Sequence, residues 1–463
     1  MSNNTQAHHL RGDLTEGNIT KKLLIFSIPM IVGNLISQLY NVVDTIVVGN
    51  FVGSDAVAAV SASFPIMMLF NALFFGVSIG AGIVVAQNYG AKRLDIVNKT
   101  VNTAFVLVYI VGVIITIGGL ALARPMLELL GTPTNIIGDS TTYLAIIFAG
   151  SLGNMAYYIG GGILRGMGDS RYPLIFLSVS AALNIILDLL FVIAFHWGVA
   201  GVAIATIISH FVSGALVHIR VNSGVYPVHV SLKSMRIDKP LTATILRLGI
   251  PSAIQNVAMS LGSVVIQSFA NRFGSNYIAA NAIVQKVDGF VIIPMMSFGM
   301  ALSTFVGQNV GAGKIERARD AINTALRLIV VFGLILGVVL WFFGGNVMRI
   351  FTDNQTVLSV AGQGIRILAF FYFIMGLNQN LSGAMRGAGA SYAPMAVSII
   401  GNFLRIPVAY FIAVRPENQY GLFWAMVFSI IIQFILLFSY YRTGHWKTQG
   451  IVVEKEKPVL EIL

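Results

Sequence analysis

Two aspartates of this sequence lie within long apolar runs, where an ionised carboxylate is costly. Asp44 belongs to the segment Gln38-Leu-Tyr-Asn-Val-Val-Asp-Thr-Ile-Val-Val-Gly49, and Asp188 lies in an apolar run at 172–195. An ionised carboxylate in hydrocarbon is destabilising unless it faces a cavity or a partner. Each aspartate is therefore expected to be protonated, paired or bound to a cation.

Asn184 and Thr206 fall at nearly the same depth as the two aspartates. Asn184 precedes Asp188 by one helical turn, so the two side chains share one face of a helix. Carboxylate, amide and hydroxyl oxygens suit a hard cation such as Na⁺, and two neighbouring carboxyl groups suit a proton. The alternative for Asn184 and Thr206 is a hydrogen bond between helices without any bound ion. We predict that Asp44, Asn184, Asp188 and Thr206 bind H⁺ or Na⁺.

The elements that carry these residues are predicted to be transmembrane helices. The chain has 463 residues, 56% of them hydrophobic and 10% charged, and its mean hydropathy is +0.81. Soluble proteins have roughly a quarter charged residues, and about 20 apolar residues span a bilayer. We predict an all-α polytopic membrane protein with twelve transmembrane helices. Their expected positions are about 21–50, 57–88, 98–124, 136–164, 172–195, 199–222, 241–272, 278–309, 320–345, 357–385, 392–415 and 420–442.

Composition and motifs exclude several classes of protein. The sequence has no cysteine, which excludes disulfides and zinc–thiolate sites. Gly76-Val-Ser-Ile-Gly80 matches a serine-hydrolase pattern, but it lies in an apolar helix rather than between a strand and a helix. There is no phosphate-binding loop for ATP. We predict no enzymatic activity and no cofactor, only the coupling ion H⁺ and/or Na⁺.

Basic residues gather at one set of helix ends. The net charge of +11 is therefore assigned to loops rather than to nucleic-acid binding, because cytoplasmic loops of membrane proteins are rich in Lys and Arg. This asymmetry predicts that both termini are cytoplasmic. The polar segment Met1–Thr20 lacks the apolar region and cleavage site of a signal peptide. We expect a multi-pass protein of a bacterial or archaeal cytoplasmic (inner) membrane, in contact with the lipid bilayer.

The two halves of the chain repeat one another. Gln87-Asn88 recurs as Gln308-Asn309, and Arg165-Gly166 recurs as Arg386-Gly387, in both cases 221 positions later. Because each half has an even number of spans, the repeat is parallel and its pseudo-twofold axis follows the membrane normal. We predict two six-helix lobes around a central cavity. The expected divisions are a tail at 1–20, a first lobe at 21–222, a linker at 223–240, a second lobe at 241–442 and a tail at 443–463.

The repeat also predicts that the cation site belongs to the first lobe alone. The positions equivalent to Asp44 and Asp188 are Val265 and Ala409, whose side chains offer no ligand to a cation. Arg405 occupies the position equivalent to that of the site's asparagine. The acidic site is therefore not a part of the scaffold that the two halves share.

The second half carries intramembrane charges of its own, at Lys286, Asp288, Arg366 and Arg405. They either form a gating network that faces the cavity or make internal pairs such as Asp288 with Arg366, and the sequence leaves both open. Met-rich and aromatic helix faces suit varied apolar ligands, although most such residues contact lipid or other helices. The candidates for substrate contact or gating are Gln38, Tyr40, Asn41, Lys286, Asp288, Met295, Arg366 and Arg405.

Pro29 and Pro251 interrupt the first and seventh helices at matched places of the repeat. A proline inside a helix removes a backbone hydrogen bond and favours a kink. A hinge at Pro29 would let the first helix bend when the occupancy of the cation site changes. The alternative is a static bend that only shapes the helix.

Several motifs resemble those of the multidrug and toxic compound extrusion (MATE) family. They are Ile28-Pro29, Gln38-Leu-Tyr-Asn-Val-Val-Asp44, the paired Gln87-Asn-Tyr-Gly-Ala91 and Gly307-Gln-Asn-Val-Gly-Ala312, and Arg165-Gly166 with Gly168-Asp-Ser170. The resemblance extends over essentially the whole chain. It implies two lobes around a large central cavity, and a monomer that exports cationic or amphipathic small molecules in exchange for H⁺ or Na⁺.

Within the family, the chain is most similar to the prokaryotic DinF-like branch. In that branch the cation site consists of an aspartate of the first span, an Asn-x-x-x-Asp of the fifth and a threonine of the sixth. Asp44, Asn184, Asp188 and Thr206 match these positions. NorM-like members keep acidic residues in the seventh and tenth spans, and this chain has none there. The resemblance thus implies no cation site in the second lobe.

The resulting prediction is a secondary active multidrug efflux antiporter. Two alternatives stay open. One is a flippase of the same superfamily for lipids or lipid-linked oligosaccharides, whose cavity would need cations such as Arg366 and Arg405 to bind phosphate. The other is a channel or a structural membrane protein, which would lack saturable exchange coupled to an ion gradient.

Overall fold

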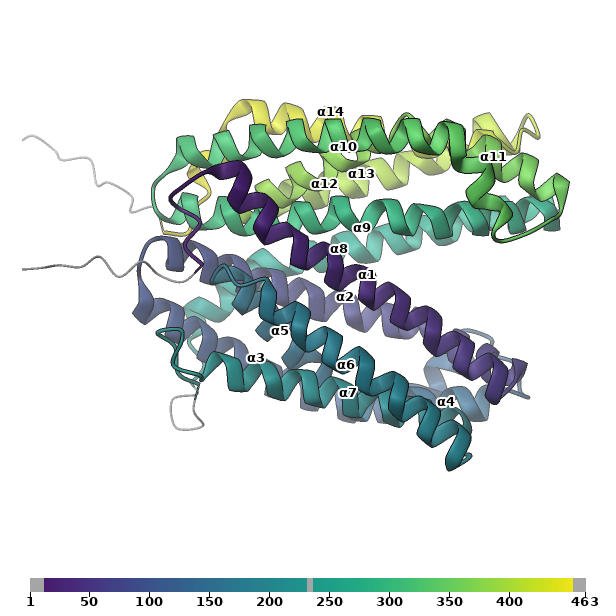
Figure 1. Cartoon of the computed structure of the whole chain (residues 1–463), viewed down its shortest axis with the longest axis horizontal. Coiled ribbons are helices and arrows are strands. Elements are labelled where there is room, and N and C mark those ends of the chain that lie inside the picture. Colours follow the sequence, from purple (N-terminus) through teal and green to yellow (C-terminus); the bar gives the residue numbers. More distant parts are fainter. Residues whose placement is uncertain (1–11, 231–235, 453–463) are drawn as a thin grey trace, which may run out of the picture.

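The chain folds as a bundle of long helices (Figure 1). The computed structural model describes residues 12–230 and 236–452, and every regular element in that range is helical. Ten helices are long and apolar enough to cross a membrane singly, and two bent helix pairs bring the spans of the described range to twelve. The prediction of an all-α polytopic membrane protein is confirmed.

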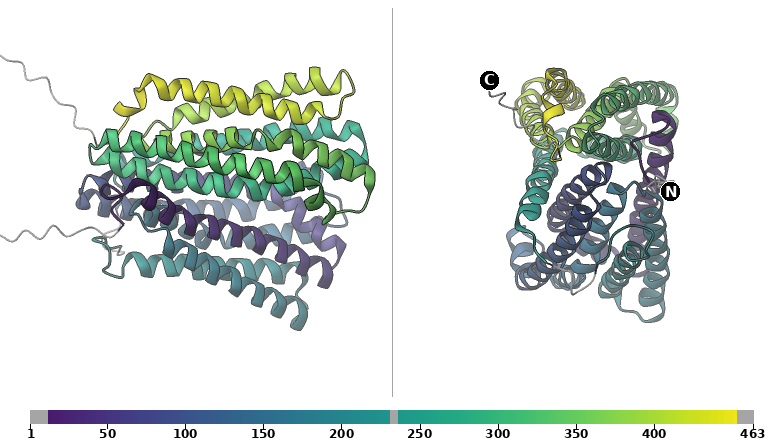
Figure 2. Two further views of the ribbon diagram at one scale, coloured as in Figure 1. Left: turned by 45° about the horizontal axis from the view of Figure 1, so that its top comes forward. Right: turned by 90° about the vertical axis from the view of Figure 1, so that its left-hand side faces the viewer.

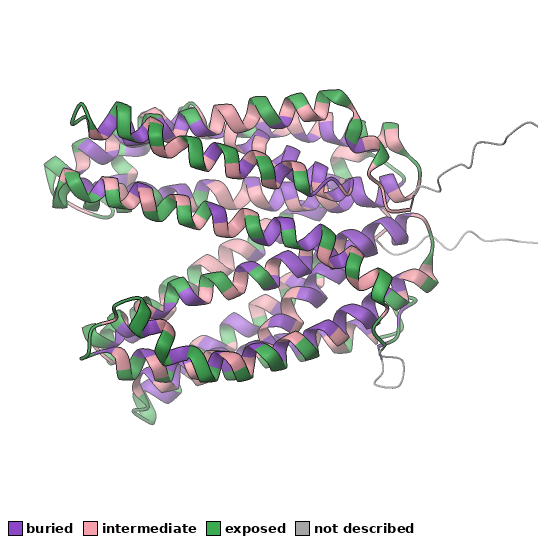
Figure 3. Ribbon diagram, turned by 180° about the vertical axis from the view of Figure 1, so that it is seen from behind, coloured by how far each residue is buried: buried purple, intermediate pink, exposed green. Residues whose placement is uncertain are grey.

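The helices form two lobes that meet at one end and diverge toward the other (Figures 1 and 2). Buried residues are concentrated where the lobes meet, near the described ends of the chain (Figure 3). The first half consists of α1 (Ile19–Phe51), α2 (Ser54–Gly90), α3 (Leu94–Leu129), α4 (Ile137–Ala149), α5 (Ser151–Gly166), α6 (Arg171–Leu189) and α7 (Gly198–Val221). The second half consists of α8 (Lys239–Ala270), α9 (Ser275–Gly311), α10 (Ile315–Arg349), α11 (Gln355–Ala369), α12 (Tyr372–Gly387), α13 (Tyr392–Ala409) and α14 (Gly421–Thr443).

Helices α1 and α8 each pack in both lobes. Leu23 and Phe26, in the first turns of α1, are buried in the core of the second lobe, whereas Val47 and Val48 are buried within the first lobe. Helix α8 makes the converse crossing: its early residues Ile245 and Leu248 are buried in the first lobe, and its late residues Ile266 and Ala270 in the second. A division of the sequence into lobes at 21–222 and 241–442 therefore does not separate the two cores.

Each half contains one bent span. Helices α4 and α5 meet at an angle of 50° next to Gly150, and α11 and α12 meet at 53° next to Phe370. A Cβ on Gly150 would lie 2.2 Å from Cγ2 of Ile207 on α7, so this break requires a residue without a side chain. The predicted single helices at 136–164 and 357–385 are therefore each broken in two, although their apolar runs continue through both breaks.

Near the termini, the hydrogen bonds that join the two lobes occur at equivalent positions of the internal repeat. Gln87 Nε2 donates to the carbonyl oxygen of Gly387 (2.8 Å), and Gln308 Nε2 donates to that of Gly166 (3.0 Å). Each glutamine thus joins its own lobe to the other one. Side chains at equivalent positions of the repeat form equivalent bonds across the interface.

The same glutamines also bind the segments that precede α1 and follow α14. Gln308 Oε1 accepts a hydrogen bond from the backbone N–H of Leu14 (2.8 Å). Gln87 Oε1 accepts one from the backbone N–H of Ile451 (2.8 Å). Both ends of the described chain are therefore bound to the interface that holds the lobes together.

Candidate functional site

A cavity of about 510 Å³ lies inside the first lobe, between α1, α2, α4, α5, α6 and α7. Its wall includes three of the residues predicted to bind the cation, Asp44, Asn184 and Thr206. Gln38 and Tyr40, which the sequence suggested for substrate contact, lie on the same wall. The helices of a single lobe therefore provide both the polar site and a space beside it.

The structure brings the four predicted cation ligands together. Asp188 is fully buried on α6, with Asn184 one turn before it. When the Asn184 amide is oriented to satisfy both of its ends, Nδ2 donates to Asp188 Oδ2 (2.9 Å) and Oδ1 accepts from the backbone N–H of Thr206 (3.2 Å). In the opposite orientation, Nδ2 donates to Thr206 Oγ1 at 3.4 Å. Soon after Asp188 the helix widens into a π-helical segment, Leu190–Ala194, a feature frequent at functional sites.

Asp44 completes the site from α1. Its carboxyl group is hydrogen-bonded to that of Asp188, and the Oδ1 atom of each is buried without a hydrogen-bond partner among the described residues. A hydrogen bond between two carboxyl groups needs a proton on one of them. Without that proton, two carboxylates beside the Asn184 and Thr206 oxygens are the kind of hard ligands that Na⁺ prefers. The arrangement can therefore hold a proton or a small cation.

Apart from Gln38 and Tyr40, much of the wall around this site was not predicted from the sequence. Tyr40 is hydrogen-bonded to Thr206. Of the residues not predicted, Tyr143 of α4 lies within electrostatic range of the two carboxyl groups. Asn154 Nδ2 of α5 donates to Asn71 Oδ1 of α2 (3.2 Å). The signal that could have found these residues is their polarity inside apolar helices, which marks functional positions in membranes. Further polar residues of the wall are Tyr157, Tyr158, Ser180 and His210.

The second lobe holds a different polar cluster. Tyr372 of α12 donates a hydrogen bond to Asp288 Oδ1 of α9, and Arg405 of α13 lies within electrostatic range of Asp288 and Tyr277. The Nε atom of Arg405 is buried without a partner in the described structure. The pairing of Asp288 with Arg366 that the sequence left open is not formed, because Arg366 is exposed on α11. The depth of a residue in its predicted helix does not reveal which helices are neighbours.

Two other candidates lie away from the first-lobe cavity. Met295 is fully buried and contacts α12, where a Cβ on Gly376 would lie 3.3 Å from its Sδ atom. The side chain fills the core between α9 and α12, and its predicted part in substrate contact or gating stays a prediction. Lys286 is exposed, with its ammonium group 5.5 Å from the ring centre of Phe351. The side chain of Asn41 lies outside the described part of the structure.

Pro29 and Pro251 lie where α1 and α8 pass from one lobe to the other. Pro29 directly precedes Met30, the last residue of α1 in the second-lobe core. Pro251 follows Leu248, the last residue of α8 in the first-lobe core. Both helices are continuous through their prolines. The hinge role of the two prolines stays a prediction, but a bend at these places would change the angle between the lobes.

Comparisons with known proteins agree with this architecture. The MatE family model matches residues 29–190 and 251–411, one segment in each half of the chain. Two proteins of Bacillus subtilis are similar: Probable multidrug resistance protein YoeA is 29% identical over 94% of this chain and 96% of its own length, and Probable multidrug resistance protein YpnP is 30% identical over 96% and 99%. A solved multidrug resistance MATE family transporter of the MOP superfamily, in an outward-facing conformation, superposes with a TM-score of 0.87 at 24% identity, over 94% of this chain and 98% of that one. The chain therefore belongs to the MATE (MatE) family of membrane transporters.

Proposed function

We propose that the protein is a secondary active antiporter that exports cationic or amphipathic small molecules in exchange for H⁺ or Na⁺. The observation that carries this proposal is the hydrogen-bonded pair of Asp44 and Asp188, held with Asn184 and Thr206 beside a cavity. Such a pair needs a proton or a cation to stay together. The names of the similar proteins support export of several drugs.

The position of the pair on two helices suggests how the ion would move the protein. Asp44 lies on α1, whereas Asp188 lies on α6, so an ion bound between them holds α1 against α6. Its departure leaves two like charges that repel each other. Because the beginning of α1 packs in the other lobe, a shift of α1 would change the angle between the lobes.

The wall of the cavity fits the proposed substrates. Beside the carboxyl pair it presents aromatic rings and methionines, which accommodate varied apolar groups and attract organic cations. A cationic substrate near Asp44 would compete with the coupling ion for the same negative charge. The apolar residues of this wall include Phe64, Met67, Met68, Phe70 and Phe74.

We further propose that the protein is a monomer in the cytoplasmic membrane with both termini in the cytoplasm. The basic residues at the helix ends near the termini support this orientation, since such loops stay on the cytoplasmic side. The two lobes then diverge toward the outside, where the substrate would be released.

Efflux of a fluorescent organic cation from vesicles tests the proposal. Export is measured for the wild type and for Asp44→Asn, with pH and Na⁺ gradients imposed separately. We expect the wild type to export under at least one gradient, which identifies the ion, and Asp44→Asn to lose gradient-driven export. Export by Asp44→Asn at the wild-type rate would remove Asp44 from the coupling site. A wild type that exports under neither gradient would refute the antiport of organic cations.

A further inference from the structure

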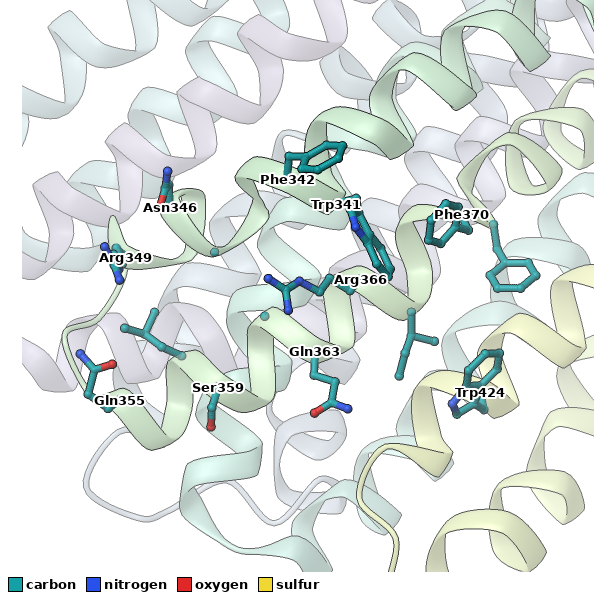
Figure 4. Close-up of a pocket in the computed structure, with 15 residues that line it drawn as sticks. Trp341, Phe342, Asn346, Arg349, Gln355, Ser359, Gln363, Arg366, Phe370 and Trp424 are labelled. Atoms are coloured by element: carbon teal, nitrogen blue, oxygen red, sulfur yellow. The ribbon is translucent and has the colours of Figure 1, made fainter.

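A second cavity, of about 920 Å³, lies on the second lobe at the end away from the termini. It is a groove between α10, α11 and Trp424 of α14 (Figure 4). The Arg366 side chain lies at its centre, near Trp341, and Arg349 and Asn346 lie toward the end of α10. We call this cavity the α10–α11 groove. It shares no residue with the first-lobe cavity.

The α11 side of the groove is a polar stripe on the first helix of the bent pair α11–α12. Gln355, Ser359 and Gln363 follow one another at intervals of one turn, and all three are exposed. From Gln355 to Arg366 the stripe is about 16 Å long, given a rise of 1.5 Å per residue. The headgroup layer of a bilayer is only about 5–8 Å thick on each side. The stripe is thus longer than the headgroup layer is thick, and polar groups that lie deeper in the bilayer are costly without partners.

The groove carries positive charge and no negative charge. Arg349 and Arg366 are its only ionisable lining residues, and neither forms an ion pair or a hydrogen bond within the described residues. The guanidinium of Arg366 lies 6.0 Å from the ring centre of Trp341, at the outer limit of a cation–π contact, and the ring carries no formal negative charge to pair with it. Two arginines without a carboxylate favour an anionic ligand, and guanidinium groups bind phosphate particularly well.

The groove continues into an apolar cavity of about 570 Å³. Phe371 and Trp424 line both spaces, so one ligand can occupy them together. Beyond these two residues the wall is entirely apolar and includes Phe411 and Phe428. A cationic, hydrogen-bonding site that opens into an apolar one matches a molecule with an anionic head and a hydrocarbon chain.

We propose that the α10–α11 groove binds an anionic phospholipid from the leaflet opposite the termini, with its phosphate at Arg366 and an acyl chain along Trp424. The lipid headgroup supplies hydrogen bonds to the polar stripe below the ordinary headgroup layer. The bound lipid lies beside the bend between α11 and α12. This site is independent of the antiport proposed above, and its occupancy is measured by binding rather than by transport.

The groove tryptophans report directly on an occupant. The protein is reconstituted in vesicles of phosphatidylcholine that contain a minor fraction of phosphatidylglycerol, and only one of the two lipids carries brominated chains, which quench nearby tryptophans. The double variant Trp341→Phe, Trp424→Phe gives the signal of the remaining tryptophans, to be subtracted. We expect brominated phosphatidylglycerol to quench the groove signal far more, per mole, than brominated phosphatidylcholine does.

Variants of Arg366 test whether this arginine causes the preference for phosphatidylglycerol over phosphatidylcholine. Arg366→Gln should weaken the preference for phosphatidylglycerol about tenfold, the usual loss for one charge-assisted hydrogen bond. Arg366→Lys should keep most of it. Arg415→Gln is the matched control, because Arg415 is also exposed at this end of the lobe but does not line the groove. Thermal unfolding in detergent without lipid establishes that each variant is folded.

The results of the quenching experiment distinguish binding of a whole phospholipid from binding of a soluble phosphate. Equal quenching by the two lipids, or an unchanged preference in Arg366→Gln, would overturn the proposal. If millimolar inorganic phosphate or glycerol phosphate relieves the quenching, the groove binds a soluble anion, and the lipid proposal would again fail. A preference that survives these soluble anions and disappears in Arg366→Gln would support it.

Discussion

The two lobes have equivalent helices but carry different side chains at equivalent depths. In the first lobe, Asp44 and Asp188 share a hydrogen bond beside a cavity. In the second lobe, the equivalent residues Val265 and Ala409 are apolar, and Arg405 lies near Asp288 instead. A cation that is part of the chain thus stands close to the buried acid of the second lobe. Among the residues that the structure describes, no side-chain cation stands close to Asp44 and Asp188.

The interface between the lobes shows the opposite behaviour. Gln87 and Gln308 form equivalent hydrogen bonds to the opposite lobe and to the two ends of the chain. The surface along which the lobes meet therefore follows the repeat, whereas the buried carboxyl pair belongs to one lobe. Under the proposed function, a movement of the lobes can be symmetric even though the ion site that drives it is not.

The largest difference is expected when one buried aspartate in each lobe is changed to asparagine. Asp188→Asn should reduce gradient-driven export about a hundredfold, because asparagine cannot share a proton with Asp44 and a hydrogen bond to a charged group is worth roughly 1.5–3 kcal/mol. Asp288→Asn should leave the coupling intact and lower the free energy of unfolding instead, because Arg405 loses its nearby acid. Parallel efflux assays and thermal unfolding measure both effects. A loss of coupling in Asp288→Asn alone would reverse the assignment of the two lobes.

A smaller effect is expected from adding a methyl group where α2 and α9 meet. A Cβ on Gly90 would lie 1.9 Å from the carbonyl oxygen of Gln308, and one on Gly311 would lie 1.9 Å from that of Gln87. Gly90→Ala and Gly311→Ala should each lower the free energy of unfolding by about 1–3 kcal/mol or force the lobes apart. Gly118→Ala is the control, because no atom lies within 4 Å of its added Cβ.

Thiol labelling distinguishes separation of the lobes from unfolding. The natural chain has no cysteine, so Ser303→Cys introduces a single reporter in a small cavity between the lobes. Faster labelling in the folded Gly90→Ala protein would show that the interface opens. Unequal effects of Gly90→Ala and Gly311→Ala would contradict the symmetry of this interface.

The sequence predicted which four polar residues lie together, because an acid in an apolar helix has few explanations. Asp44, Asp188, Asn184 and Thr206 were selected by depth and helix face, and the structure places them together. Depth and face do not determine which helices adjoin, and for this reason the contact of Tyr372 with Asp288 was not foreseen. The crossing of α1 and α8 between the lobes was missed for the same reason.

The bends between α4 and α5 and between α11 and α12 were missed for another reason. Gly150 has no side chain and Phe370 has a large aromatic one, although the two residues lie at nearly the same place in the repeat. One break depends on close contact with Ile207, which is distant in sequence. A tertiary contact of this kind leaves no periodic pattern within the helix itself.

The hydrogen bonds of the two glutamines offer a more graded test of symmetry. Gln87→Ala and Gln308→Ala each remove bonds to the opposite lobe and to one end of the chain, so each should cost about 1–3 kcal/mol of stability. Gln285→Ala removes an exposed side chain and should change stability by less than about 0.5 kcal/mol. Chemical or thermal unfolding in detergent compares the three. A much larger loss for one glutamine would mean that the two ends of the chain are not bound equivalently.

The smallest effect is expected from removal of the Thr206 hydroxyl group. This change tests whether the hydroxyl binds the ion or only makes a contact between helices. Thr206 Oγ1 donates to Val202 O (3.0 Å) and is also bonded to Tyr40. Thr206→Val keeps the shape but removes the oxygen, and should raise the ion concentration for half-maximal export about fivefold, as for one lost hydrogen bond. Thr206→Ser keeps the oxygen and should resemble the wild type. If serine shifts the ion dependence as much as valine does, the methyl group matters rather than the hydroxyl, and Thr206 contributes through helix contacts alone. The ion site would then consist of the asparagine and the two carboxyl groups, which would still confine it to the first lobe.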